Sequence, residues 1–434
     1  MTTILFVHGT GVRADSYDVT LEQVRRGLAK ALPDAAVEGC AWGDVLGVGA
    51  QPTARAEEDE AEPVGTGAVP GGPRWSDAER AVWARLYDDP LFEIRLTALE
   101  DTPPPSARAL SLLRDRISAL PDQPEIRDAL TGEGPGPDLP GPDRADAAGA
   151  GPEGPADARQ SGARQAAAPQ PTTPEPAALR EAARLLLADA EFQAALPSLA
   201  AAKSHDLIAR ALVSAYIRLR EEAAGGVIVA ADDRDALARA LTDALGGVAL
   251  GVGSRARGAA WTTAQYAARP YLRRRRDKLL DLATPAAGDI LVYQARGKAL
   301  RRFIAERVRA VEGPVVLLGH SLGGIASFET LLTESLPQVE LVVTVGSQVP
   351  YLHGLDALAT HRLGAPLPER FRARWLNLHD PVDLLSYPAA PYFGSRVVDV
   401  QVDTREPFPR AHSAYWTTRA VYEAVRVQVE GGPR

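Results

Sequence analysis

The sequence predicts an α/β protein, with helices flanking a mostly parallel central sheet and a large, mainly helical insertion. Three observations lead to this prediction. Short apolar runs alternate with helical patterns at both ends of the chain. One of these runs, 315–318, is apolar throughout, which suits a central parallel strand buried on both faces. Between the two ends, helical patterns and Gly/Pro-rich linkers replace this alternation.

The chain before the insertion is predicted to contain two strands and one helix. Residues 4–7 form a β-rich run that ends in a Gly-rich turn at 8–11, and residues 21–32 carry the apolar spacing of a helix. A second apolar run, about 37–42, predicts the next strand. The chain therefore starts as strand, turn, helix and strand.

A helical insertion, or cap, is predicted at residues 46–284. The linker at 131–176 holds ten prolines among many Ala, Gly and Asp, and cannot bury enough apolar surface to offset its ordering entropy, so we expect a flexible loop. The insertion also contains a basic cluster, 273–276 with Lys278, which is either a solvated helix face or a contact for an anionic membrane surface. The predicted helices are 76–87, 106–119, 177–195, 203–223, 232–246 and 258–283.

Strand and helix alternation resumes near residue 289, so residues 1–45 and 285–434 together form the predicted sheet core. The predicted strands are 289–293, 315–318, 340–345, 373–378 and 396–402. The predicted helices are 298–311, 323–335 and 412–428.

Composition excludes several functional classes. The net charge of −8 does not attract polyanions, which argues against nucleic-acid binding. The lone Cys40 cannot form an internal disulfide, and neither a thiolate zinc site nor a helical His/Glu/Asp metal pattern is present. The chain shows no signal peptide or membrane span, so we expect a cytoplasmic protein without a cofactor or metal.

The first candidate catalytic motif is Gly319-His320-Ser321-Leu322-Gly323. It follows the buried-type strand and precedes a helical pattern. A Gly-x-Ser-x-Gly motif in this context predicts a nucleophile elbow, a sharp turn that exposes the serine hydroxyl. The small residues leave room for the backbone to fold back. Ser321 is therefore the candidate nucleophile.

A serine nucleophile needs a base and an acid that orients the base. His412, at the start of the final helical pattern, is the candidate base. Asp380 and Asp383 follow a late strand and are both candidate acids, with Asp383 preferred. Ser321, Asp383 and His412 would then form a catalytic triad.

Two backbone N–H groups would stabilise the negative oxygen of the reaction intermediate. The turn after the first strand can direct the N–H of Thr10 toward the same point as the N–H of Leu322, which follows the candidate nucleophile. These two residues are the predicted oxyanion hole.

Together, these motifs resemble the α/β-hydrolase superfamily, especially lipase-like branches such as the DDHD-type phospholipases and the class 3 lipases. The pattern of an Asn, then an Asp with two apolar residues, then Ser and Tyr, marks the acid loop in those branches. Asn377, Asp383 and the residues 384–387 match it, as does the Tyr415-Trp416 pair after the candidate base. The resemblance covers about 195 residues of the predicted core. It leaves the insertion unexplained.

The resemblance implies a serine hydrolase that cleaves a carboxylic ester, of a lipid-like substrate, as a lipase, phospholipase or esterase does. A thioesterase, an amidase or a peptidase would use the same residues. From another class, the chain could be an effector module whose hydrolase core is regulated by a protein or membrane partner that docks on the insertion.

Overall fold

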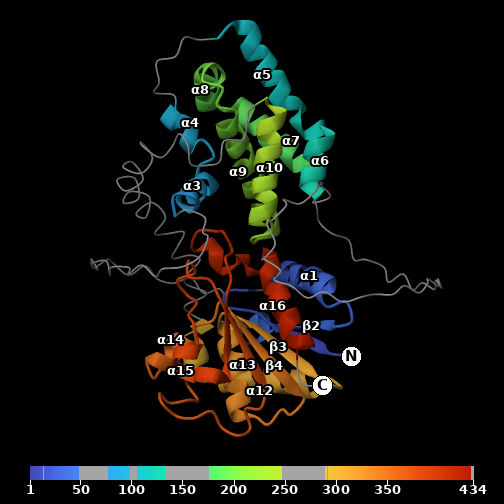
Figure 1. The fold of residues 1–434 in the computed structure, drawn as a ribbon, viewed down its shortest axis with the longest axis vertical. Helices are drawn as coiled ribbons and strands as arrows, with labels where there is room; N and C mark the ends of the chain where they lie inside the picture. The colour runs from blue at the N-terminus through green and yellow to red at the C-terminus, as the bar shows by residue number, and fades with distance from the viewer. Residues whose placement is uncertain are drawn as a thin grey trace, which may run out of the picture.

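The computed structural model describes residues 1–12, 14–47, 77–97, 105–131, 175–246, 289–290 and 292–431. Figure 1 shows two parts, a sheet flanked by helices and a group of helices at one end of it. None of the described helices combines the length and the hydropathy that a membrane crossing needs.

The described strands form one six-stranded sheet in the order β2-β1-β3-β4-β5-β6, and every neighbouring pair is parallel. Interior strands of a parallel sheet are covered on both faces, which explains why β3 is buried at all six positions. The α/β prediction is confirmed. The strands are β1 (Thr3–Val7), β2 (Ala36–Cys40), β3 (Val315–His320), β4 (Val339–Val345), β5 (Arg374–His379) and β6 (Val398–Gln401).

Two hydrophobic clusters cover the two faces of the sheet. On one face α1 (Ala14–Ala31) and α16 (Arg419–Glu430) pack against alternate strand residues, including Phe6 and Leu318. On the other face α12 (Lys298–Arg309) and α13 (Leu322–Thr333) pack against residues such as Leu5 and Leu317. Strand side chains alternate between faces, so successive residues of β1 and β3 enter opposite clusters. Short helices complete this part of the chain: α2 (Gly43–Leu46), α14 (Val349–Gly354), α15 (Ala390–Phe393), η2 (Gly394–Arg396), η3 (Arg410–His412) and η4 (Ala414–Thr417).

The helices α3 to α10, which we call the helical unit, surround a third cluster that contains no strand residue. Its buried centre includes Trp83, Ile117, Phe192 and Leu212. The helical unit therefore has a hydrophobic core of its own. Its elements are α3 (Asp77–Asp88), α4 (Phe92–Thr97), α5 (Ala107–Ala119), η1 (Leu120–Asp122), α6 (Pro124–Thr131), α7 (Glu175–Ala188), α8 (Ala190–Ala201), α9 (His205–Ala224) and α10 (Ala231–Ala244).

One predicted strand is wrong. Residues 289–290 and 292–296 are helical, whereas the apolar run 289–293 predicted a strand. A short apolar run cannot distinguish a strand from a buried helical segment. Here the run buries Tyr293, whose hydroxyl donates to Glu329 Oε2 of α13 at 2.5 Å.

Three predictions lie outside the described residues. They are nearly all of the loop at 131–176, the helix at 258–283 and the basic cluster within that helix.

Candidate functional site

The candidate site lies where the strand order changes direction. From β1 the chain proceeds to β2 on one side, whereas β3 pairs with β1 on the other side. Loops that leave the carboxyl ends of such strands diverge, and ligands of open α/β sheets bind in the crevice between them. The loop after β1 carries Thr10, and the turn after β3 carries Ser321.

Ser321 occupies a single-residue turn between β3 and α13. Its φ of 52° and ψ of −121° are unusual for a residue with a side chain and indicate local backbone strain. A Cβ on Gly319 would lie 2.6 Å from the Gly323 carbonyl oxygen, and a Cβ on Gly323 would lie 2.2 Å from that of Val7. The two glycines thus permit both the sharp turn and its contact with the end of β1.

The Ser321 hydroxyl is buried beside a glutamine amide. Gln348, which is also buried, places its Nε2 3.5 Å from Ser321 Oγ, and its Oε1 has no hydrogen-bond partner among the described residues. The neighbouring Ser347 hydroxyl donates to the Ser321 carbonyl at 3.0 Å. The α14 side of the site therefore contacts both the side chain and the backbone of Ser321.

His412 pairs with Asp383. The Nδ1 of His412 donates to Asp383 Oδ2 at 2.9 Å, and the Tyr415 hydroxyl donates to the same oxygen at 3.0 Å. The other carboxylate oxygen accepts from the Leu385 N–H at 3.0 Å. Burial and the nearby Asp383 carboxylate raise the pKa of Tyr415 far above its usual range, so this hydroxyl stays protonated and can donate. With the proton on Nδ1, His412 Nε2 is free to accept one.

Asp380 has a different set of contacts. Its Oδ2 accepts from the backbone N–H and the hydroxyl of Thr404, at 2.9 and 2.7 Å, and its Oδ1 accepts from the Val382 N–H at 2.9 Å. It makes no hydrogen bond with His412. The structure therefore brings Asp383 to the candidate base, while Asp380 holds the loop in shape.

Ser321 and the His412–Asp383 pair lie at the same edge of the sheet. The Ser321 N–H donates to Val345 O at 2.9 Å, and a Cβ on the next residue, Gly346, would lie 3.2 Å from Asp383 Oδ2. Among the described residues no hydrogen bond joins Ser321 Oγ to His412. Such bonds are often long without substrate and shorten in the complex.

His320 connects the serine turn to the candidate base. Its Nε2 donates to the His412 carbonyl at 2.8 Å, and the two imidazole rings lie 4.9 Å apart. Burial, and then the nearby His412, lower the pKa of His320 to about 3. His320 is therefore neutral at physiological pH and can donate this bond.

This pKa predicts a pH-dependent stability. Below pH 6.5 the unfolded chain binds a proton at His320, whereas the folded chain does so only near pH 3, so stability is lost as the pH falls between these values. Between pH 7.5 and pH 5 we expect His320 to account for a loss of about 2 kcal/mol. Urea unfolding of the wild type and of His320→Gln, which keeps an N–H donor, would measure it. An equal loss in both proteins would contradict the assignment.

The two predicted oxyanion donors are available. Neither the Thr10 nor the Leu322 N–H has a hydrogen-bond partner in the described part of the chain. A Cβ on Gly9 would lie 3.0 Å from Ser321 Cβ, so the loop that carries Thr10 touches the serine turn. The loop that carries Thr10 thus packs against the turn that precedes Leu322.

His8 and Asp289 fix this loop. His8 Nε2 accepts from the Trp42 and Gly43 N–H groups, each at 3.2 Å, so its proton is on Nδ1, which donates to Gly9 O at 2.8 Å. Asp289 accepts from the Gly11 N–H at 2.8 Å. The backbone is therefore held on both sides of Thr10, as a preorganised donor requires.

Sequence reasoning missed the roles of His8, His320, Tyr415, Gln348 and Asp289 in the site. His8 and His320 lie within recognised motifs, so their positions were a usable signal. Gln348 and Asp289 belong to no motif, and only the fold brings them to the site.

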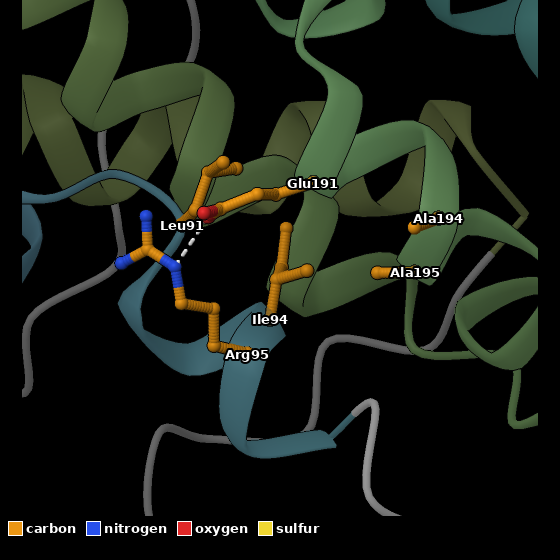
Figure 2. A pocket seen from close by; sticks show the side chains of 6 residues that line it. All are labelled: Leu91, Ile94, Arg95, Glu191, Ala194 and Ala195. Atoms are coloured by element: carbon orange, nitrogen blue, oxygen red, sulfur yellow. Dashed lines mark hydrogen bonds and ion pairs between the residues drawn. The ribbon is translucent and has the colours of Figure 1, made fainter.

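A separate pocket of about 370 Å³ lies between α4 and α8, within the helical unit (Figure 2). Figure 1 shows these helices well away from the sheet. An ion pair between Arg95 Nε and Glu191 Oε2, 2.6 Å long, closes one side of it. The pocket contains no candidate nucleophile, and we do not place the site there.

No protein-family model, no curated protein and no solved structure matches this chain. Within the described ranges, no three His, Cys, Asp or Glu side chains are grouped so that they could hold a metal ion. The geometry around Ser321 is therefore the main indication of function.

Proposed function

We propose that the chain is a serine hydrolase with an α/β-hydrolase fold that cleaves a carboxylic ester of a lipid-like substrate. One observation carries the proposal: Ser321 occupies a strained turn between strand and helix, at the sheet edge where His412 bonds to buried Asp383. A strained turn that presents a serine beside an oriented imidazole is the arrangement that nucleophilic catalysis needs.

The reaction would follow from these contacts. Ser321 Oγ attacks the ester carbonyl carbon while His412 Nε2 takes its proton, and Asp383 stabilises the imidazolium that forms. The N–H groups of Thr10 and Leu322 donate to the negative oxygen of the tetrahedral intermediate. His412 then protonates the leaving alkoxide as its bond to carbon breaks. A water molecule, deprotonated by His412, hydrolyses the acyl-enzyme and restores Ser321.

Exposed apolar side chains beside the site favour a lipid-like substrate. Leu384 and Leu385, directly after Asp383, are 55% and 39% exposed. Tyr351 of α14 is 47% exposed, and its ring stacks on that of Tyr387 with the centroids 5.0 Å apart. Apolar surface next to reacting groups can bind an acyl chain by the hydrophobic effect.

Labelling with a fluorophosphonate probe tests the proposal, because the probe reacts only with an activated serine. We expect the folded protein to be labelled, the urea-unfolded protein not to be, and mass spectrometry to locate the label on Ser321. A label on another serine, or no label, would refute the assignment.

A panel of p-nitrophenyl esters, thioesters and anilides would then identify the substrate class. We expect the highest kcat/KM with oxygen esters, increasing with acyl-chain length. A preference for thioesters or anilides would indicate a thioesterase or an amidase.

A further inference from the structure

The segment 403–412, which ends at His412, is held by the helical unit. In Figure 1 the red C-terminal part of the chain lies between the sheet and the near end of the helical unit. Four charged side chains of this segment, Asp403, Arg405, Glu406 and Arg410, pair with residues that precede them by 170 positions or more. The charged side chains of the segment are therefore held by the helical unit, whereas Thr404 and His412 are held by the sheet core.

Glu406 is the centre of this cluster and is only 1% exposed. Arg234 of α10, fully buried, donates to its Oε1 at 2.8 Å, and the Tyr87 hydroxyl of α3 donates to its Oε2 at 2.9 Å. Arg410 Nε donates to the same Oε2 at 2.9 Å. A buried carboxylate of this kind is stable only while its partners remain.

Arg410 extends the cluster toward His412. Its guanidinium forms a two-bond pair with Glu221 of α9, one bond being 2.6 Å, and lies over the Tyr87 ring at 4.4 Å from the centroid. Arg410 and His412 belong to the same 3-10 turn, η3. A displacement of Arg410 would therefore displace His412.

Three further ion pairs hold the start of the segment. Arg80 of α3 donates to Asp403 at 2.6 Å and to the Glu406 carbonyl at 3.2 Å. Arg405 pairs with Asp232 and Asp235 of α10. The helices α3, α9 and α10 thus all form ion pairs or hydrogen bonds with the segment 403–412.

We propose that the helical unit positions His412, because Arg234 and Glu221 hold Glu406 and Arg410 of the segment that ends at His412. The inference rests on the proposed function, in which His412 is the base. Arg234 and Glu221 are positioning residues, which touch neither the substrate nor Ser321. Without Arg234, the buried charge of Glu406 has one partner fewer, and without Glu221 the same is true of Arg410. We therefore expect the segment 403–412 to shift in either variant. A misplacement of about 1 Å can lower a rate by about 10²-fold.

The test uses Glu221→Gln, which keeps the shape of the side chain and removes its charge. The matched control is Glu93→Gln, because Glu93 also forms a two-bond pair with an arginine, Arg210 of α9, at 2.6 and 3.1 Å, and this pair lies within the helical unit. Arg234→Met is a second test variant. p-Nitrophenyl acetate is the substrate, since its small acyl group needs little apolar surface for binding.

We expect Glu221→Gln and Arg234→Met to lower kcat by about 10- to 100-fold with KM unchanged, and to slow fluorophosphonate labelling by the same factor. Glu93→Gln should keep wild-type values. Hydrogen exchange should be faster at the amides of residues 404–412 in the two test variants and not in the control.

Wild-type kcat in both test variants would overturn the inference, and so would an equal loss in Glu93→Gln. An increase in KM alone would overturn it too, because the helical unit would then bind substrate instead of positioning the base. If the wild type neither hydrolyses esters nor takes the label, the proposed function fails. Unchanged hydrogen exchange at residues 404–412 in the two test variants would separately disprove that the helical unit positions this segment.

Discussion

Replacing Ser321 with alanine is expected to lower kcat/KM for ester hydrolysis by about 10⁶-fold and to abolish fluorophosphonate labelling. Alanine removes only the hydroxyl that would attack the carbonyl, and Ser321 occupies the strained turn at the sheet edge that carries the His412–Asp383 pair. Residual activity would come from the oxyanion donors alone. The measurement is hydrolysis of p-nitrophenyl esters, with circular dichroism to show that the fold is intact.

Ser321→Gly provides a matched variant. It should be equally inactive but more stable than Ser321→Ala by about 1 kcal/mol, because glycine adopts a φ of 52° without the steric cost of a Cβ. Activity retained in either variant would show that Ser321 is not the nucleophile. Equal stability of the two would show that the turn stores no strain.

Replacing Asp383 with asparagine is expected to lower kcat by about 10⁴-fold, because the amide can no longer stabilise the imidazolium and can favour the wrong tautomer of His412. Asp380→Asn is the matched control, since both carboxylates are 1% exposed and lie three residues apart. Asp380 bonds to Thr404 and Val382, so its replacement should lower stability by about 1–3 kcal/mol and kcat by less than about tenfold.

Kinetics and thermal unfolding of both variants would distinguish the two roles. A larger loss of kcat in Asp380→Asn would move the acid assignment to Asp380. Equal losses would indicate that the loop, and not one carboxylate, determines the activity.

The local pattern around Ser321 was sufficient to predict its turn. Glycines two residues before and two residues after it, a buried strand before it and a helix after it are all local features. In the structure β3 ends at His320 and α13 begins at Leu322. The choice between Asp380 and Asp383 could not be settled by spacing, because it depends on which carboxylate meets Thr404 from a later loop.

Long-range contacts could not be predicted from the sequence pattern. Nothing near Arg410 indicates that Glu221, 189 positions earlier, is its partner. The apolar run at 289–293 was wrongly predicted as a strand, because a short apolar run also fits a buried helix and the buried partner of Tyr293, Glu329, lies on another element. Motifs thus predict the reacting groups, and tertiary pairing determines what supports them.

The pairing of β1 with β3 has a consequence for biosynthesis. Thr3 is opposite Val315, so at about 5–20 residues per second the ribosome needs about 15–60 s to supply the neighbour of the first strand. The helical unit between them has a separate core and can fold during this interval. Until β3 emerges, the edge of β1 that later pairs with β3 has unpaired backbone N–H and C=O groups, so a nascent chain that is stalled or truncated before residue 315 would expose an aggregation-prone edge.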